Sequence, residues 1–172
     1  MLLIVDGYNI IGAWPEFAKT VDLAQSRDRL IHMLADYAGF SGAKIILVFD
    51  GYGSDKKSVT LEEQFGIQVV YTRQHETADH YIERTVDQFL EGMPKFARAD
   101  VRVATNDALE QSVVLSRGAI RLPAAELRRE VLSVRGAGRE RHGGGGTRRP
   151  MTFEDRLTDA QKERLERMRR GE

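Results

Sequence analysis

The chain has 172 residues, of which 41% are hydrophobic and 30% charged, a size and composition typical of a globular protein with one sizeable core. It contains no cysteine, which excludes disulfides, thiolate nucleophiles and zinc sites built on sulfur, and none of its apolar runs is long enough to cross a membrane. The first residues form an apolar strand pattern without a basic leader, so we expect a cytoplasmic protein.

The net charge of zero hides an asymmetry along the chain. Residues 1–134 hold 15 Lys and Arg against 19 Asp and Glu, whereas residues 135–172 hold 11 against 7. The body is therefore acidic and the tail basic. This pattern is expected when the acids hold a cation and the arm contacts a polyanion, and a merely solvated tail is equally compatible with the charge alone.

The first strand is predicted over residues 2–5, where four large apolar residues follow one another and Asp6 comes directly after them. A continuous apolar run indicates a strand that is buried on both faces. In open α/β sheets, ligands bind at the carboxyl ends of the strands, so Asp6 is a candidate metal or substrate ligand. The alternative is that Asp6 only caps the following turn, because Gly7-Tyr8-Asn9 has the composition of a turn.

A second strand repeats this design. A helix is predicted between the two strands, from a cap at Asp22 to Gly39, because apolar residues recur there at helical spacing. Residues 44–49 then form another apolar run, which is closed by Asp50. Two strands of one sheet that each end in Asp-Gly favour a shared role for the two acids.

The middle of the chain is predicted to continue the alternation. A polar loop over residues 51–57 leads to a short stretch at 61–65 that we expect to be helical, and then to a third strand at 67–71. Thr77 is a good cap for the helix that follows.

The helix after Thr77 carries acids at intervals of four residues, at Asp79, Glu83 and Asp87. They fall on one face, and like charges at this spacing repel unless something positive lies between them or solvent screens them. Asp79 lies in the first turn and is favoured by the helix dipole, so a plain N-terminal charge is the alternative to a functional role. Glu83 and Asp87 are also compatible with a solvated face.

The rest of the body repeats the pattern once more. A fourth strand at residues 100–105 ends in Asn106 and Asp107, where another helix begins. A short edge strand at 119–123 and a helix at 124–134 complete the body.

Strands that alternate with helices predict a three-layer α/β/α domain with a mostly parallel central sheet over residues 1–134. Residues 135–152 are rich in glycine and arginine, with four successive glycines, and are predicted to form a flexible linker or basic loop. Residues 153–172 are predicted to form a charged helix. The chain is therefore expected to be one folded domain with a basic, flexible C-terminal extension.

Four acids would meet at one edge of such a sheet: Asp6, Asp50 and Asp107 at strand ends, and Asp79 at a helix start. Carboxylates packed together cannot all stay ionised without a cation, because neighbouring like charges raise each other's pKa. Ligands that are all oxygen suit hard ions such as Mg²⁺ or Mn²⁺. We therefore predict all four as metal ligands and catalytic residues of a site where a cation activates water against a phosphodiester.

Other polar residues are candidates for substrate binding. Asn9 and Asn106 could hold a water ligand or a phosphate, and Thr105 offers a hydroxyl, although ordinary turn roles compete for the asparagines. The arginines of the basic tail that are predicted to hold RNA are Arg139, Arg141, Arg148 and Arg149. The sequence has no Ser/His/Asp arrangement and no Walker-type phosphate loop.

Four motifs occur in order along the chain: Asp6-Gly7-Tyr8-Asn9, Phe49-Asp50-Gly51-Tyr52, Glu76-Thr77-Ala78-Asp79 with Ile82-Glu83, and Ala104-Thr105-Asn106-Asp107 with Glu110-Gln111. Together they resemble the NYN domain family, relatives of the PIN-like nucleases, and in particular its bacterial YacP-like group. The resemblance covers nearly the whole chain. It implies a metal-dependent nuclease whose acids correspond to Asp6, Asp79 and Asp107, with Asp50 as a further member and Asn9 as a binding residue.

The YacP-like group includes a ribosome-associated endoribonuclease that cuts mRNA. The resemblance therefore implies Mg²⁺ or Mn²⁺ as cofactor and RNA, in the form of mRNA, and the ribosome as partners. It implies no membrane partner and no preference for DNA.

Three functions remain open on the sequence. The favoured one is a metal-dependent endoribonuclease. The second is an RNA- or ribosome-binding module whose acidic site is degenerate. The third, a phosphatase of the haloacid dehalogenase type, ranks last because that class wants Asp-x-Asp after the first strand and this chain has Tyr8 at the second aspartate's position.

Overall fold

The computed structural model describes residues 1–20, 22–51, 58–140, 158, 162, 166 and 167, without the side chains of residues 109–110 and 135–140. Within them, the strands are β1 (Leu2–Asp6), β2 (Lys44–Phe49), β3 (Thr60–Gln64), β4 (Ile67–Tyr71), β5 (Val101–Thr105) and β6 (Ile120–Pro123). The α-helices are α1 (Gly7–Ala13), α2 (Leu23–Ser41), α3 (Ala78–Leu90), α4 (Ala108–Arg117) and α5 (Ala124–Glu140), and two 3₁₀ turns cover Pro15–Phe17 and Lys95–Asp100.

The strands form one six-stranded sheet in the order β3-β4-β2-β1-β5-β6. Every neighbouring pair is parallel except β3 and β4, which form an antiparallel hairpin at one edge. Val5 of the central strand β1 is paired with Leu47 of β2 on one side and with Ala104 of β5 on the other. The three strands therefore end at nearly the same level.

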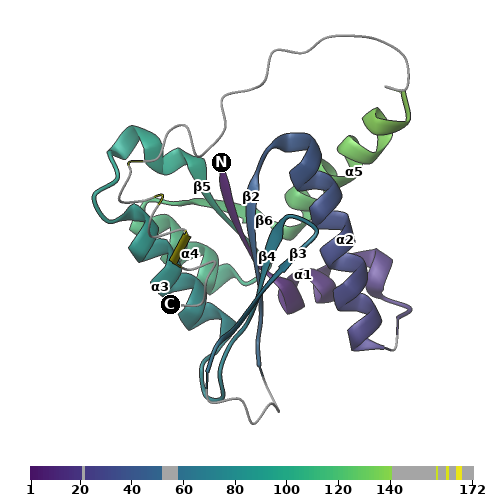
Figure 1. The fold of residues 1–172 in the computed structure, drawn as a ribbon, viewed down its shortest axis with the longest axis horizontal. Helices are drawn as coiled ribbons and strands as arrows, with labels where there is room; N and C mark the ends of the chain where they lie inside the picture. Colours follow the sequence, from purple (N-terminus) through teal and green to yellow (C-terminus); the bar gives the residue numbers. More distant parts are fainter. Residues whose placement is uncertain (21, 52–57, 141–157, 159–161, 163–165, 168–172) are drawn as a thin grey trace.

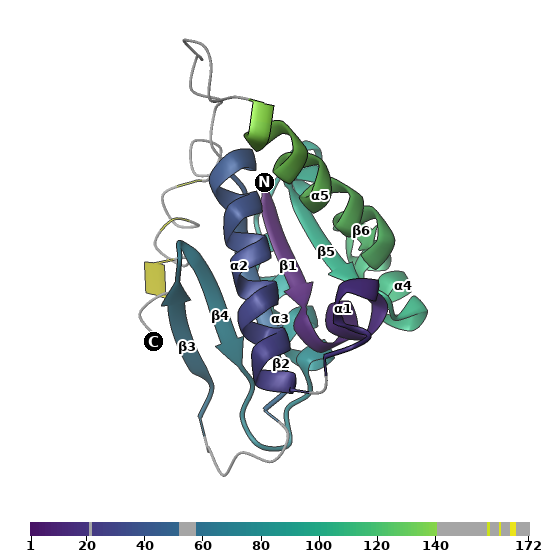
Figure 2. The ribbon, with the colours of Figure 1, turned by 90° about the vertical axis from the view of Figure 1, so that its right-hand side faces the viewer.

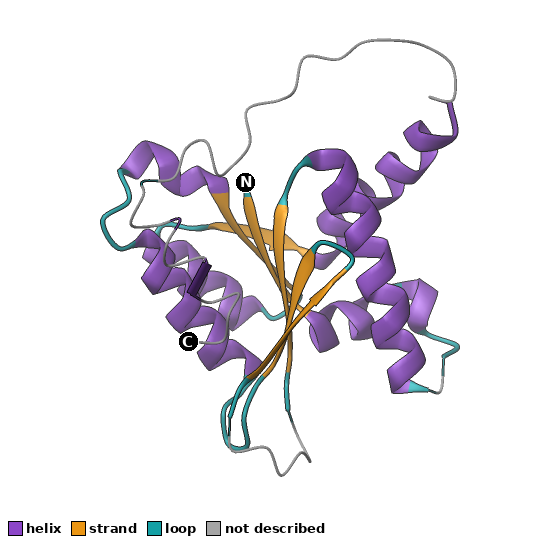
Figure 3. Ribbon diagram, in the orientation of Figure 1, coloured by secondary structure: helices purple, strands orange, loops and turns teal. Residues whose placement is uncertain are grey.

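Helices cover both faces of the sheet, as the sequence predicts. Figures 1 and 3 show α1, α2 and α5 on one face and α3 and α4 on the other. Each face has its own hydrophobic cluster, because successive strand residues point to opposite sides. In β1, Leu3 and Val5 belong to the cluster under α2 and α5, whereas Leu2 and Ile4 belong to the cluster under α3. The three-layer fold with a mostly parallel sheet is confirmed.

Residues 7–13 form a helix, so the interpretation of Gly7-Tyr8-Asn9 as a turn was wrong. Asp6 is the N-cap of this helix, and its carboxylate accepts a hydrogen bond from the backbone N–H of Asn9. Glycine is a poor helix former, but the cap and the burial of Ile10 in the core stabilise this two-turn segment. Tertiary packing thus overrides the local turn signal.

Residues 60–64 form strand β3, so the helix expected at residues 61–65 was wrong. The segment contains good helix formers, Glu62 and Glu63, but it is too short to be stable as an isolated helix. The hairpin turn at Phe65 and Gly66, both with positive φ, aligns it instead for pairing with β4. Backbone pairing with the neighbouring strand β4 decides the conformation here.

The other predicted elements are present, with small shifts at their ends. Asp22 caps α2, and this helix continues past Gly39 to a left-handed Gly42. α5 extends to Glu140, six residues beyond the predicted end of the domain at residue 134. The division at residue 134 and the charged helix at 153–172 stay predictions, since most residues after 140 lie outside the described part of the chain. No helix in that described part is long and apolar enough to span a lipid bilayer.

Candidate active site

The carboxyl ends of the parallel strands carry the four acids that the sequence singles out. Asp6 is the last residue of β1, Asp50 follows the last residue of β2, and Asp107 comes two residues after β5. Asp79 is the second residue of α3, which begins after β4. In Figure 2, β1, β2, β4 and β5 run in the same direction toward this edge. We call these four residues the acid edge.

Asp6 is the most buried member of the acid edge, with 5% of its surface exposed. Its carboxylate accepts hydrogen bonds from the backbone N–H of Asn9 at 3.1 Å and from the side-chain amide of Asn9 at 3.3 Å. Burial raises the pKa of Asp6, and the charges of Asp79 and Asp50 raise it further, against the opposing effect of the Asn9 hydrogen bonds. Asp6 is thus both a helix cap and a member of an acidic group.

Asp79 is exposed, yet the charges of other acids also affect its pKa. Burial of part of its carboxyl group raises its pKa, followed by the charges of Asp107, Glu83 and Asp50, while His80 acts in the opposite direction. Asp6 and Asp79 are each affected by the charge of Asp50, Asp6 also by that of Asp79, and Asp79 also by that of Asp107, so these electrostatic effects link the four acids.

Whether these acids fit a metal ion depends on how closely they gather. Among the described residues, no three His, Asp or Glu side chains come together in a group that could hold one ion. Mg²⁺ commonly uses only one or two carboxylates and keeps several waters. A pair of acids such as Asp6 and Asp79, in which the charge of Asp79 raises the pKa of Asp6, fits such a hydrated ion better than an ion enclosed by protein ligands. Asp50 and Asp107 would then act on waters or substrate.

The neutral candidates near the acid edge differ in accessibility. Asn9 is half-buried and orients Asp6. Asn106 is exposed, so its amide is open to a ligand. Thr105 is fully buried, and its hydroxyl accepts a hydrogen bond from the backbone N–H of Asp107 at 3.1 Å. Thr105 therefore positions Asp107, and its predicted contact with substrate is not supported by this geometry.

The other two acids on the Asp79 face of α3 have a positive partner. Arg117 of α4 forms salt bridges with both Glu83, at 3.0 Å, and Asp87. This cation relieves the repulsion that the spacing of four residues predicts. Asp79 makes no salt bridge with any residue in the described part of the chain, which sets it apart on the same helix.

Packing beneath the acid edge depends on a glycine that sequence reasoning assigned to a turn. A Cβ atom added to Gly7 would lie 2.3 Å from the Phe49 ring, far inside van der Waals contact. Gly7 follows Asp6, and Phe49 precedes Asp50. A side chain at position 7 would therefore collide with the Phe49 ring beside Asp50.

The tail arginines cannot be placed at this site. Arg139 lies in the last turn of α5, where side chains are not described, and Arg141, Arg148 and Arg149 lie outside the described residues. Their role in binding RNA stays a prediction.

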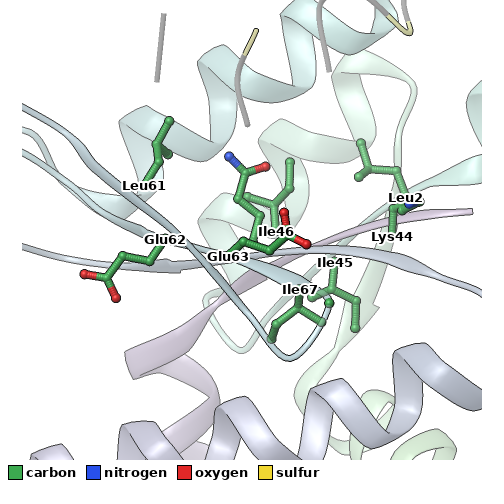
Figure 4. Close-up of a pocket in the computed structure, with 10 residues that line it drawn as sticks. Leu2, Lys44, Ile45, Ile46, Leu61, Glu62, Glu63 and Ile67 are labelled. Atoms are coloured by element: carbon green, nitrogen blue, oxygen red, sulfur yellow. The ribbon is translucent and has the colours of Figure 1, made fainter. Parts of the chain in front are cut away.

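Two of the hollows on the surface of the described residues bear on the position of the site. One lies at the opposite end of the strands from the acids, under the β3–β4 hairpin (Figure 4). Its lining is Leu2, Lys44, Ile45, Ile46, Leu61, Glu62, Glu63, Gly66, Ile67 and Gln68. It contains no residue of the acid edge. The second adjoins the acid edge and is lined by Asp50, Gly51, Arg73, Gln74, His75, Glu76 and Thr77.

Sequence reasoning missed several residues around the acid edge. Thr72 is buried after β4, and its hydroxyl accepts a hydrogen bond from the backbone N–H of Gly51 at 2.9 Å, which ties the loop after Asp50 to β4. Arg27 of α2 donates a hydrogen bond to the Tyr8 hydroxyl at 2.9 Å. Neither contact has a signal in the local sequence, because each joins residues about twenty positions apart.

Comparisons with known proteins agree with this fold. The family model of the YacP-like NYN domain matches residues 3–170. The Bacillus subtilis (strain 168) protein YacP is 37% identical over 138 residues, which are 77% of this chain and 76% of that protein.

Two crystal structures from Bacillus subtilis are also similar. Rae1 (YacP) has a TM-score of 0.65 at 31% identity, over 99% of this chain and 95% of that one. A point mutant of Rae1 has a TM-score of 0.65 at 34% identity, over 81% of this chain and 80% of that one. The acids at the carboxyl ends of the strands, the three-layer fold and these matches lead to one conclusion: the chain belongs to the YacP-like NYN domain family, which implies a nuclease- or RNA-related function.

Proposed function

We propose that this protein is a metal-dependent endoribonuclease that hydrolyses phosphodiester bonds of mRNA in association with the ribosome. The observation that carries the proposal is the acid edge. Asp6 and Asp79 have raised pKa values, chiefly through burial, and neighbouring acids raise both further: Asp79 and Asp50 act on Asp6, and Asp107, Glu83 and Asp50 act on Asp79. Neither makes a salt bridge with any described residue. A protein that gained nothing from this repulsion could replace either carboxylate with an amide.

The chain's own residues prepare the site in three ways. Asn9 holds the Asp6 carboxylate in one orientation through two hydrogen bonds. Thr105 fixes the backbone of Asp107. Asn106 offers an exposed amide that can donate hydrogen bonds to phosphate oxygens. Mg²⁺ or Mn²⁺ bound by Asp6 and Asp79 would supply an activated water and neutralise charge on the phosphate.

RNA as the substrate class follows from family membership, and mRNA and the ribosome follow from the resemblance to the YacP-like group. Arg139, Arg141, Arg148 and Arg149 give the tail the positive charge that contact with a nucleic-acid backbone needs.

A second candidate is an RNA- or ribosome-binding module without catalysis. One observation favours it: in the described part of the chain, no three acids or histidines gather around a single ion position. This candidate predicts tight, salt-sensitive binding and no turnover in any metal.

Cleavage of a translated mRNA tests the two candidates against each other. Wild type and Asp6→Asn are compared with and without ribosomes, in Mg²⁺, Mn²⁺ or EDTA. We expect wild type to cut with ribosomes and metal, and the variant to be inactive while still binding ribosomes. If neither protein cuts under any condition but both sediment with ribosomes, the binding module replaces the nuclease.

A further inference from the structure

A cluster of two tyrosines and one arginine lies beside the acid edge. The guanidinium of Arg27 donates a hydrogen bond from Nη1 to the Tyr8 hydroxyl at 2.9 Å. Tyr8 and Tyr71 both pack against Phe49, with ring centroids 5.1 and 5.7 Å from its centroid. We call Tyr8, Arg27 and Tyr71 the tyrosine–arginine cluster.

The fold places this cluster next to the predicted catalytic residues. Tyr8 is two residues after Asp6, and Phe49, on which the cluster rests, directly precedes Asp50. Tyr71 is the last residue of β4 and is paired in register with Phe49. Figure 2 shows α2, which carries Arg27, beside α1 and the end of β2. The cluster therefore extends the acid edge on the side of α2 and β4.

Arg27 carries a charge that no described carboxylate neutralises in a salt bridge. Arg117 pairs with Glu83, by contrast, and Arg128 with Glu16. Arg27 donates its hydrogen bond to a neutral phenol, which orients the guanidinium and leaves most of its five N–H donors for another acceptor. A half-buried guanidinium in this state suits a phosphate group.

The tyrosines add a second kind of recognition. Tyr8 and Tyr71 are both half-buried, and the ring of each packs against the buried ring of Phe49. Aromatic rings beside a cation are the usual means of holding unpaired nucleotides, through stacking on bases and contact with the backbone. The charges of Glu62 and Asp28, both exposed, act on Tyr71 and disfavour a phosphate at that ring. A base suits Tyr71 better. Asp28 also acts on Arg27, but it makes no salt bridge with that guanidinium in the described part of the chain.

We propose that the tyrosine–arginine cluster is a nucleotide subsite of the RNA strand, in which Arg27 binds the phosphate adjacent to the one at the acid edge and Tyr71 stacks on its base. The proposal deepens the nuclease function and rests on it for the identity of the ligand. It requires the bound segment of RNA to be single-stranded, because a base can stack on a side chain only when it is unpaired.

Fluorescence anisotropy of a labelled single-stranded RNA of about ten nucleotides, bound by the full-length chain in EDTA, tests the subsite apart from cleavage. The variants are Arg27→Gln and the control Arg29→Gln, which lies on the same helix and whose guanidinium contacts the carbonyl of Glu16 and the Phe17 ring. We expect Arg27→Gln to weaken binding about tenfold and to reduce the slope of log K against log salt by about 0.7. Arg29→Gln should match wild type in both respects.

Tyr71 provides a second, independent comparison. Tyr71→Leu removes the stacking surface and should weaken binding about five- to fiftyfold, whereas Tyr71→Phe keeps the ring and should bind as wild type does. Circular dichroism and the thermal unfolding midpoint of each variant exclude loss of fold as the cause.

The subsite is overturned if wild type shows no saturable binding, or if Arg27→Gln and Arg29→Gln bind equally well with the same salt slope. The nuclease proposal fails separately, when wild type binds RNA in an Arg27-dependent way but cuts no RNA in Mg²⁺ or Mn²⁺. If wild type and Arg27→Gln cut RNA at the same rate when the RNA concentration is limiting, that result contradicts the subsite but not the nuclease function.

Discussion

The acids of the acid edge and those near α5 have opposite surroundings. Glu130 of α5 accepts hydrogen bonds from Arg102, at 2.8 and 3.1 Å, and from the Tyr37 hydroxyl at 2.6 Å. Burial alone would raise the pKa of Glu130, but the bonds from Arg102 and Tyr37 outweigh it and hold the pKa below its usual value. Asp6 is more deeply buried, and its hydrogen bonds in the described part of the chain come from the backbone N–H and the side-chain amide of Asn9. These bonds do not outweigh burial, so the pKa of Asp6 is raised.

This difference separates acids that stabilise the fold from acids that serve a function. Glu16 repeats the first arrangement, since the bidentate bond from Arg128 lowers its pKa. Arginines thus pair with Glu16 and Glu130, whereas Asp6 and Asp79 make no salt bridge with any described residue. Perturbed carboxylates left without a cation in one place are typical of catalytic or metal sites.

The largest effect is expected at Asp79. Asp79→Asn removes a carboxylate from the acid edge and should reduce cleavage by at least about 100-fold, because loss of a direct metal ligand exceeds the 10- to 100-fold cost of losing a supporting group. The fold should be unchanged. The matched control is Asp87→Asn, on the same helix and paired with Arg117, which should cleave within about twofold of wild type. Equal losses of cleavage in Asp79→Asn and Asp87→Asn would contradict the distinction between functional and structural acids.

Gly7→Ala tests whether the spacing of the acid edge depends on Phe49. The added Cβ overlaps the Phe49 ring, and overpacking should lower the free energy of unfolding by about 1–3 kcal/mol, as measured in urea. Gly12→Ala in the same helix meets nothing within 4 Å and should raise the free energy of unfolding by up to about 1 kcal/mol. A Gly7→Ala protein as stable as Gly12→Ala would show that the close approach is not needed.

Glu130→Gln tests the paired region. The substitution replaces the carboxylate that accepts hydrogen bonds from Arg102 and Tyr37. It should lower the free energy of unfolding at pH 7 by about 1–2 kcal/mol. This value is toward the low end for hydrogen bonds to charged groups, because Glu130 is partly exposed. Since the folded pKa of Glu130 is lowered, its contribution is present above its unfolded pKa and is lost as the pH falls. The difference between variant and wild type should therefore shrink at acidic pH.

The stability of Asp6→Asn relative to wild type should depend on pH in the opposite direction. The change in free energy of unfolding should be the smallest of those predicted here. The folded pKa of Asp6 is raised, so protonated Asp6 favours the fold, and this contribution is lost as the pH rises from about its ordinary value of 3.8 through the raised pKa. Asparagine caps a helix about as well as aspartate. The variant should gain stability over wild type as the pH rises from 4 to 7 in urea titrations. A constant difference would mean that Asp6 is not perturbed.

Patterns within short segments were enough to predict most of the fold. The buried strands β1, β2 and β5 were predicted because an apolar run with an acid at or just after its end is a local signal, and parallel topology then brings their ends together. β3 was missed because Glu62 and Glu63 favour a helix, whereas its pairing with β4 is a contact between segments. The helix at Gly7–Ala13 was missed because its stability comes from its cap and from the core.

The surroundings of the acids were less predictable than the acids themselves. The salt bridges from Arg117 to α3 and the bond from Arg27 to Tyr8 join distant parts of the chain. A single sequence carries no signal for such pairs. Thr105 is a further example. The sequence shows a hydroxyl two residues before Asp107, but it does not show that this hydroxyl is buried.

Binding of Mn²⁺, measured by isothermal titration calorimetry, tests most directly that the acid edge holds a divalent cation. Wild type, Asp6→Asn and the control Asp87→Asn are titrated at pH 7.5 without RNA. The account predicts saturable binding by wild type and by Asp87→Asn, and binding weakened at least about tenfold in Asp6→Asn. Identical Mn²⁺ affinity in all three proteins, or no saturable binding by wild type, would contradict it.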